Sequence, residues 1–171
     1  MKRTSLISTI TLVFAAFATD AFAQETASAT ATATIVTPIS IVKDVDMNFG
    51  NVAVQSTAGG TVVLTPAGVR STTGGVTLPS TATGTITAAS FTVTGTGNYS
   101  YSITLPSTAL TITSGSNTMT VTNFTSDPSG VGTLTAGTQT LNVGATLNVS
   151  AAQAAGTYVS GTPFDVTVNY N

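Results

Sequence analysis

Apolar and polar residues alternate along much of this chain, and the alternation is clearest in the last stretch. There the apolar residues fall at every second position: Phe164, Val166, Val168 and Tyr170. A period of two places one set of side chains on a buried face and the other toward water, so it predicts a half-buried strand that closes the core. Earlier runs have the same character and also predict strands: Thr61–Thr65, Gly84–Thr94, Asn98–Leu105, Ala109–Thr113, Thr118–Phe124 and Thr138–Ser150.

The spacing of these runs predicts an all-β fold. Turn signals such as Gly95–Gly97 and Asp127–Gly130 separate them, and no long run has the period of a helix. A chain of 171 residues suits a single domain. We therefore expect a two-sheet antiparallel β-sandwich over residues 35–171. Its expected core contains Phe49, Phe91, Tyr99, Ile103, Phe124, Leu141, Val166 and Val168.

Residues 1–23 have the three parts of a secretory signal peptide. A Lys-Arg pair opens the segment, Leu6–Phe17 forms a short apolar run, and Ala21–Ala23 fits the small-residue cleavage rule. The apolar run is too short and too rich in Ser and Thr to span about 30 Å of hydrocarbon. We expect cleavage before Gln24 and export of the rest of the chain. The absence of Cys favours a bacterial periplasm or cell surface as the destination.

Residues 24–34 form an extension in which Ala alternates with Thr or Ser. Its odd-numbered apolar phase continues into Ile35, Ile39, Ile41, Val45, Met47 and Phe49, with Thr37 and Lys43 as exceptions. One interpretation is a flexible leader joined to a first strand. The other is a strand offered to another subunit. The donor face would then consist of Ala27, Ala29, Ala31, Ala33, Ile35, Ile39 and Ile41. Periodicity does not assign a partner, so both interpretations stay open.

Candidate chemistry is sparse. The chain has no His and no Cys, which leaves its Ser hydroxyls without an activating imidazole and excludes thiol chemistry. Asp44–Gly50 superficially matches the start of a calcium loop, but its Gly falls one position late and no closing Glu follows. A net charge of −2 creates no field that attracts nucleic acid or an anionic membrane. We expect no enzymatic activity, catalytic residues, metal ligands, cofactor or nucleic-acid partner, and no membrane insertion after cleavage.

Three motifs carry a resemblance to a known family. They are Gly156–Tyr158, the closing run Pro163–Tyr170 with its penultimate Tyr, and the early run Ile39–Gly50. Together they resemble chaperone–usher pilins, spore-coat-U-like pilins and related small secreted bacterial β-domains. The absence of Cys is a departure, because many such pilins carry a disulfide.

The resemblance implies an immunoglobulin-like sandwich that serves as a structural subunit of a bacterial pilus or fimbria. The subunit would form a homopolymer by N-terminal donor-strand exchange, served by a periplasmic chaperone and an outer-membrane usher. It would pass through the periplasm to a fibre on the cell surface. The alternative is a monomeric secreted adhesin or matrix domain that keeps its own N-terminal strand and binds carbohydrate or protein through loops. A fibre subunit gives a ladder of oligomers, whereas an adhesin is a monomer.

Overall fold

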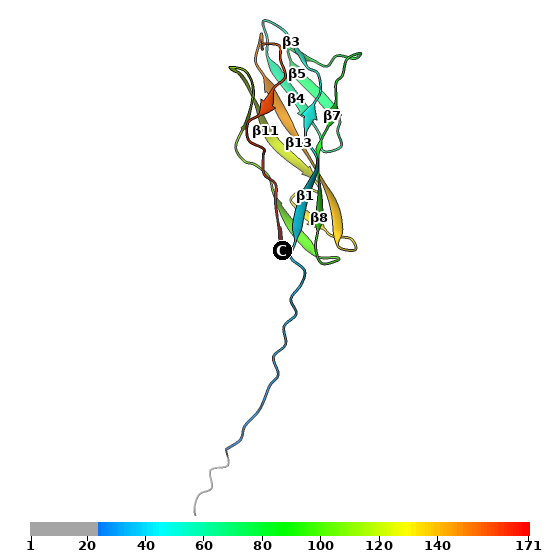
Figure 1. Ribbon diagram of the computed structural model, residues 1–171, viewed down its shortest axis with the longest axis vertical. Helices are drawn as coiled ribbons and strands as arrows, with labels where there is room; N and C mark the ends of the chain where they lie inside the picture. Colours follow the sequence, from blue (N-terminus) through cyan, green and yellow to red (C-terminus); the bar gives the residue numbers. More distant parts are fainter. Residues whose placement is uncertain (1–23) are drawn as a thin grey trace, which may run out of the picture. The chain divides into compact units, whose positions relative to one another are not determined.

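The computed structural model describes residues 24–171, and the expected signal peptide lies outside the described residues. The chain divides into two units after Thr34. Residues 24–34 contain no strand, and residues 35–171 form a compact unit that carries every strand of the described chain (Figure 1). Within the described part, no helix is long and apolar enough to cross a membrane.

The strands of the compact unit are short, apart from two long ones near the centre of the main sheet. In chain order they are β1 (Ser40–Val45), β2 (Asn48–Phe49), β3 (Ala53–Val54), β4 (Gly60–Leu64), β5 (Arg70–Gly74), β6 (Val76–Thr77), β7 (Ile86–Thr87), β8 (Ala89–Thr94), β9 (Ser100–Thr104), β10 (Leu110–Ser114), β11 (Asn117–Asp127), β12 (Val131–Thr133), β13 (Thr138–Val149), β14 (Val159–Ser160) and β15 (Thr167–Tyr170).

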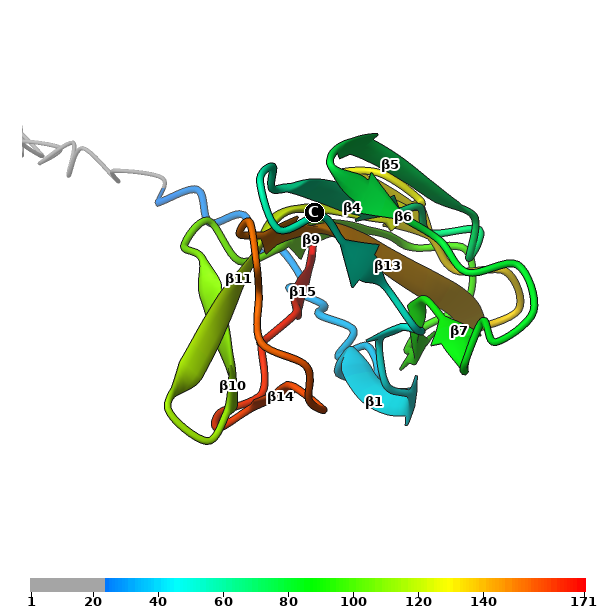
Figure 2. The ribbon, with the colours of Figure 1, turned by 90° about the horizontal axis from the view of Figure 1, so that it is seen from above.

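The main sheet is organised around β13. Its strand order is β1-β8-β13-β11-β10-β14; β4 also pairs with β13, and β5 pairs with β4. Residues 138–143 of β13 pair with β8, whereas residues 145–149 pair with β4. A second sheet has the order β12-β9-β15, and the pairs β2–β7 and β3–β6 form two small ladders. All ladders are antiparallel, and the second sheet packs on the main sheet (Figure 2). The expected all-β antiparallel sandwich is confirmed.

Two apolar clusters fill the sandwich. The first, cluster 1, joins both sheets and consists of Ala89, Phe91, Val93, Tyr101, Leu134, Leu141, Val143 and Val168. The second, cluster 2, lies under β4 and the second half of β13 and consists of Val62, Val76, Val121, Ala145, Leu147 and Val149. Met47 and Phe124 pack against both clusters, so the apolar interior is continuous.

The expected core is correct for most of its members and wrong for one. Phe91, Leu141 and Val168 are buried, and the other apolar residues expected there are half-buried against the two clusters, apart from Tyr99. Tyr99 is 44% exposed. The reason is the preceding turn: Asn98 adopts a left-handed conformation with φ of 63°, and β9 begins only at Ser100.

Candidate functional site

Two edge strands lie side by side in the compact unit without pairing with each other. Within residues 24–171, β1 pairs only with β8, and β15 pairs only with β9. The two strands approach each other, and the end of the chain lies beside the start of β1 (Figure 1). Figure 2 shows β15 beside the segment that leads into β1. We call the space between these two facing edges the open seam. Along this seam, residues 24–171 leave both edges without a ladder partner.

The backbone of β15 presents hydrogen-bonding groups to the open seam. The N–H of Asn171 donates to the carbonyl oxygen of Ser100 on the β9 side, at 3.2 Å. The N–H groups of alternate residues in a strand point to the same side, so Asn169 also faces β9. The N–H and C=O groups of Val168 and Tyr170 therefore face the seam, where residues 24–171 supply no strand to pair with them.

Half-buried apolar side chains occur along both edges of the open seam. Ile39 and Ile41 come from the β1 side, and Phe164 and Val166 come from the segment that leads into β15. All four pack against cluster 1 but are only half-buried. A further strand that covered this apolar area would stabilise the assembly by about 25 cal/mol per Å² removed from water.

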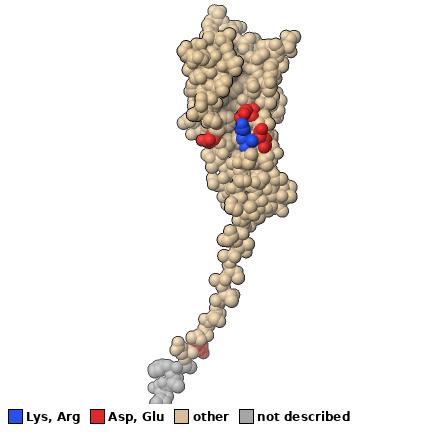
Figure 3. All heavy atoms as spheres, in the orientation of Figure 1, with Lys and Arg blue, Asp and Glu red and all other residues tan. Residues whose placement is uncertain are grey.

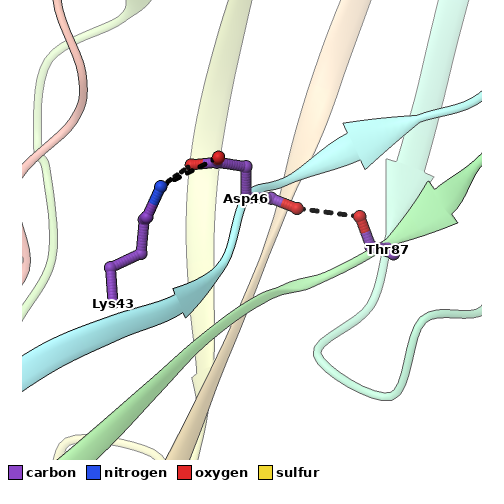
Figure 4. Close-up of polar contacts among 3 residues, drawn as sticks. All are labelled: Lys43, Asp46 and Thr87. Carbon is purple, nitrogen blue, oxygen red and sulfur yellow. Dashed lines mark hydrogen bonds and ion pairs between the residues drawn. The ribbon is translucent and has the colours of Figure 1, made fainter.

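Lys43 interrupts the apolar row on β1. It pairs across the ladder with Phe91, which is buried, so Lys43 lies on the inner face of the sheet. Its side chain remains 53% exposed, and its ammonium group bonds both carboxylate oxygens of Asp46 at 2.8 and 2.9 Å (Figure 4). Asp46 is fixed in turn, because its carbonyl oxygen accepts a hydrogen bond from the Thr87 hydroxyl at 2.8 Å.

The same part of β1 is irregular in its pairing. The register with β8 shifts between Lys43 and Val45, and Val45 is 41% exposed although the sequence alternation had placed it on the inner face. On the face shown in Figure 3, the charged side chains of the compact unit gather in its middle and most of the remaining surface is uncharged. One edge of the open seam thus carries an ion pair and a bulge.

The residues of the closing run lie together at the other edge. Val168 is 7% exposed, and Phe164, Val166 and Tyr170 are half-buried against cluster 1. Regular pairing starts only at Thr167, so Phe164 and Val166 keep the alternation outside the ladder. Tyr170 pairs with Tyr101, which is fully buried, and burial raises the pKa of the Tyr101 phenol above its ordinary value.

The expected donor residues divide into two groups. Ala27, Ala29, Ala31 and Ala33 are exposed and lie outside any strand, and Ile35 is 93% exposed. Ile39 and Ile41 instead pack against cluster 1 of their own molecule, and Ile41 lies in β1. Ile39 and Ile41 therefore belong to the sandwich of their own molecule, whereas the four Ala residues and Ile35 remain exposed.

A set of polar contacts at the end of the open seam had no counterpart in the sequence analysis. The Tyr170 hydroxyl donates to the carbonyl oxygen of Thr37 at 2.9 Å and accepts from the N–H of Thr96 at 2.7 Å. The Thr96 hydroxyl accepts from the N–H of Thr37 at 3.0 Å. We call these contacts the Thr37 clasp. The sequence signal at this place, Gly95–Gly97, had predicted only a turn.

The fold is an antiparallel β-sandwich in which the edge strands β1 and β15 do not pair with each other. The chain belongs to the family described as "Domain of unknown function (DUF4402)", which matches residues 39–170. The matched range contains both edges of the open seam and begins after the N-terminal extension, residues 24–34. No curated protein matches the chain, and no solved structure does.

Proposed function

We propose that this protein is a structural subunit of a bacterial surface fibre that polymerises by donor-strand exchange. In this proposal the segment Ala27–Ile35 of one copy fills the open seam of the next copy. Export through the periplasm, and assistance by a chaperone and an usher, are parts of the same proposal. The single observation that carries it is the open seam, an unpaired strand position above half-buried apolar side chains, in a chain that also has an exposed alternating segment.

The donor segment has a suitable length and pattern. Nine residues in a strand extend about 30 Å, which exceeds the roughly 23 Å of the segment Phe164–Tyr170. The odd-numbered Ala residues and Ile35 would face the sandwich, and the Thr and Ser side chains between them would face water. Each Ala methyl contributes only about 0.8 kcal/mol on burial, so Ile35 and the backbone hydrogen bonds to β15 must supply most of the binding.

The test compares three full-length chains that are exported with residues 1–23 in place. In Ile35→Asp, a carboxylate would enter the apolar seam without a partner, and we expect polymerisation to stop while the domain still folds. Thr34→Asp is the matched control, because it adds the same charge to the face that points to water. Native gels and electron microscopy should show fibres for the wild type and for Thr34→Asp, and monomers for Ile35→Asp.

Truncation provides the independent check. A chain that lacks residues 24–35 after the leader should fold and remain monomeric. If this chain polymerises as well as the wild type, or if the wild type itself is a monomer, the fibre proposal fails.

One observation favours the alternative of a monomeric adhesin. A surface cleft of about 580 Å³ lies beside β15, and the residues that line it include Thr104, Thr167, Phe164 and Asp165. Hydroxyls, an aromatic ring and a single carboxylate are groups that suit a carbohydrate ligand. A monomeric wild type that binds an oligosaccharide, and loses binding in Asp165→Ala, would favour this second function.

A further inference from the structure

The Thr37 clasp holds the chain where it enters β1. The Tyr170 hydroxyl donates a hydrogen bond to the carbonyl oxygen of Thr37, and the Thr37 N–H donates one to the Thr96 hydroxyl. Both backbone groups of Thr37 are therefore hydrogen-bonded within the molecule. The clasp joins three separate parts of the fold. They are the segment before β1, the end of β15 and the turn after β8.

Gly95 makes room for the clasp. A Cβ atom at this position would collide with the Tyr170 hydroxyl and would lie 3.0 Å from Cδ1 of Leu134. Any side chain at Gly95 would therefore displace the phenol from Thr96 and Thr37. Tyr99 packs against the Tyr170 ring with a centroid separation of 5.6 Å, and its hydroxyl takes no part in the clasp.

The clasp constrains the path of the chain just before β1. A chain that fills the open seam of its own molecule must reverse close to Thr37, because β1 itself forms one side of that seam. Pro38 restricts Thr37 to an extended conformation, which opposes such a reversal. The two hydrogen bonds to Thr37 oppose it as well, because a tight turn there would have to break them.

We propose that Tyr170 and Thr96 are positioning residues that direct the donor segment into the seam of a second copy and away from its own seam. This inference rests on the proposed fibre function. Without the clasp, the chain before β1 is released to turn back, and self-closed monomers compete with fibres. Loss of one hydrogen bond should raise the ratio of self-closed to intermolecular pairing on the order of two- to tenfold.

Disulfide trapping distinguishes the two pairings, and the absence of Cys from the chain makes it clean. The full-length chain carries Thr167→Cys on the exposed face of β15, together with Thr30→Cys, Thr32→Cys or Thr34→Cys in turn. After mild oxidation, intermolecular pairing gives a covalent ladder on a denaturing gel. Self-closure gives a monomer with an internal disulfide, identified by its mass and its mobility before reduction.

These trapping chains are then combined with clasp variants. Tyr170→Phe and Thr96→Val each remove a hydroxyl and keep the side-chain shape, and Gly95→Ala displaces the phenol without removing it. We expect each to shift pairing from the ladder toward the internal disulfide, and the double variant Tyr170→Phe/Thr96→Val to shift it furthest. Tyr99→Phe is the matched control and should give the wild-type ladder.

The outcomes separate this inference from the fibre function. A wild-type ladder that every clasp variant reproduces in full overturns the positioning role and leaves the fibre proposal intact. A wild type that gives no ladder at any of the three positions overturns the fibre proposal, and the inference falls with it. If Tyr170→Phe fails to fold, Thr96→Val decides the question, because Thr96 lies outside the core clusters.

Discussion

The strands β1 and β15 form the two sides of one open seam, but they protect their edges differently. On β1, the inward-facing Lys43 is paired with Asp46, and the ladder with β8 is irregular at the same place. Inward-facing charges and bulges are two ways in which edge strands avoid pairing with other chains. On β15, the register with β9 is regular over all four residues, and the inward side chains Val168 and Tyr170 are apolar or aromatic.

This difference indicates which edge accepts a further strand. The β1 edge resists a partner, because a strand that covers Lys43 would have to desolvate its ammonium group. The β15 edge has no such obstacle, and its backbone groups at Val168 and Tyr170 face the seam. We therefore expect the donor segment to pair with β15 and to leave the edge of β1 largely unpaired. Three substitutions examine this difference. Val166→Lys adds an inward-facing charge beside β15, Val168→Ala weakens the packing of β15 on the core, and Lys43→Val removes the inward-facing charge of β1.

The largest effect is expected from Val166→Lys, which adds an inward-facing charge beside β15. Because Val166 is only half-buried, the long Lys side chain can reach water while the seam is empty, and the domain should fold. A donor strand would trap the charge, so polymerisation should fall by more than about tenfold, as several kcal/mol of desolvation implies. Fibre yield by sedimentation is the measurement. Thr167→Lys, on the exposed face, is the control, and equal loss in both variants would contradict the assignment of faces.

A smaller effect is expected from Val168→Ala, which tests how firmly β15 belongs to the core. Val168 is 7% exposed in cluster 1, and removing two buried methyl groups should lower the free energy of unfolding by about 1–3 kcal/mol. Thr167→Ala changes the exposed neighbour and should stay within about 0.5 kcal/mol of the wild type. Denaturant unfolding measures both, in the Ile35→Asp background that keeps the chains monomeric. Equal losses would mean that the register of β15 is wrong.

The smallest effect on folding is expected from Lys43→Val. Exposed ion pairs contribute less than about 1 kcal/mol, so the free energy of unfolding should change little. The β1 edge, however, would lose its inward charge and should begin to associate with other copies. Light scattering against concentration, again in the Ile35→Asp background, should show larger particles for Lys43→Val and none for Lys43→Arg. No association in Lys43→Val would show that the charge does not protect this edge.

The sequence predicted those strands in which apolar residues mark one face. Alternation identified the strands β9, β13 and β15 within three residues of their ends, and it joined β7 and β8 in one predicted strand, Gly84–Thr94. It missed β5, whose residues Arg70–Gly74 contain no apolar side chain, because an edge strand rich in hydroxyls leaves no periodic signal. It also placed Val45 on the wrong face, since a bulge shifts the phase and a sequence does not reveal where pairing slips.

The candidate site was partly predictable for the same reason. Alternation marked the extension, residues 24–34, and the closing run, and Lys43 was visible as an exception to the pattern. The Thr37 clasp left no such signal, because its partners are 133, 74 and 59 residues apart in the sequence. The open seam itself is a property of strand order. Local periodicity carries no information about which strand lies beside which.

Hydrogen exchange at the backbone amides of β15 tests the central claim most directly. It should be measured residue by residue on wild-type fibres and on the Ile35→Asp monomer, with β1 of the same molecule as the internal reference. If the donor segment pairs with β15, exchange at Val168 and Tyr170 slows strongly in the fibre, residues 27–35 become protected, and the amides of β1 change little. Unchanged exchange at Val168 and Tyr170, or new protection confined to Ser40–Val45, would contradict the account.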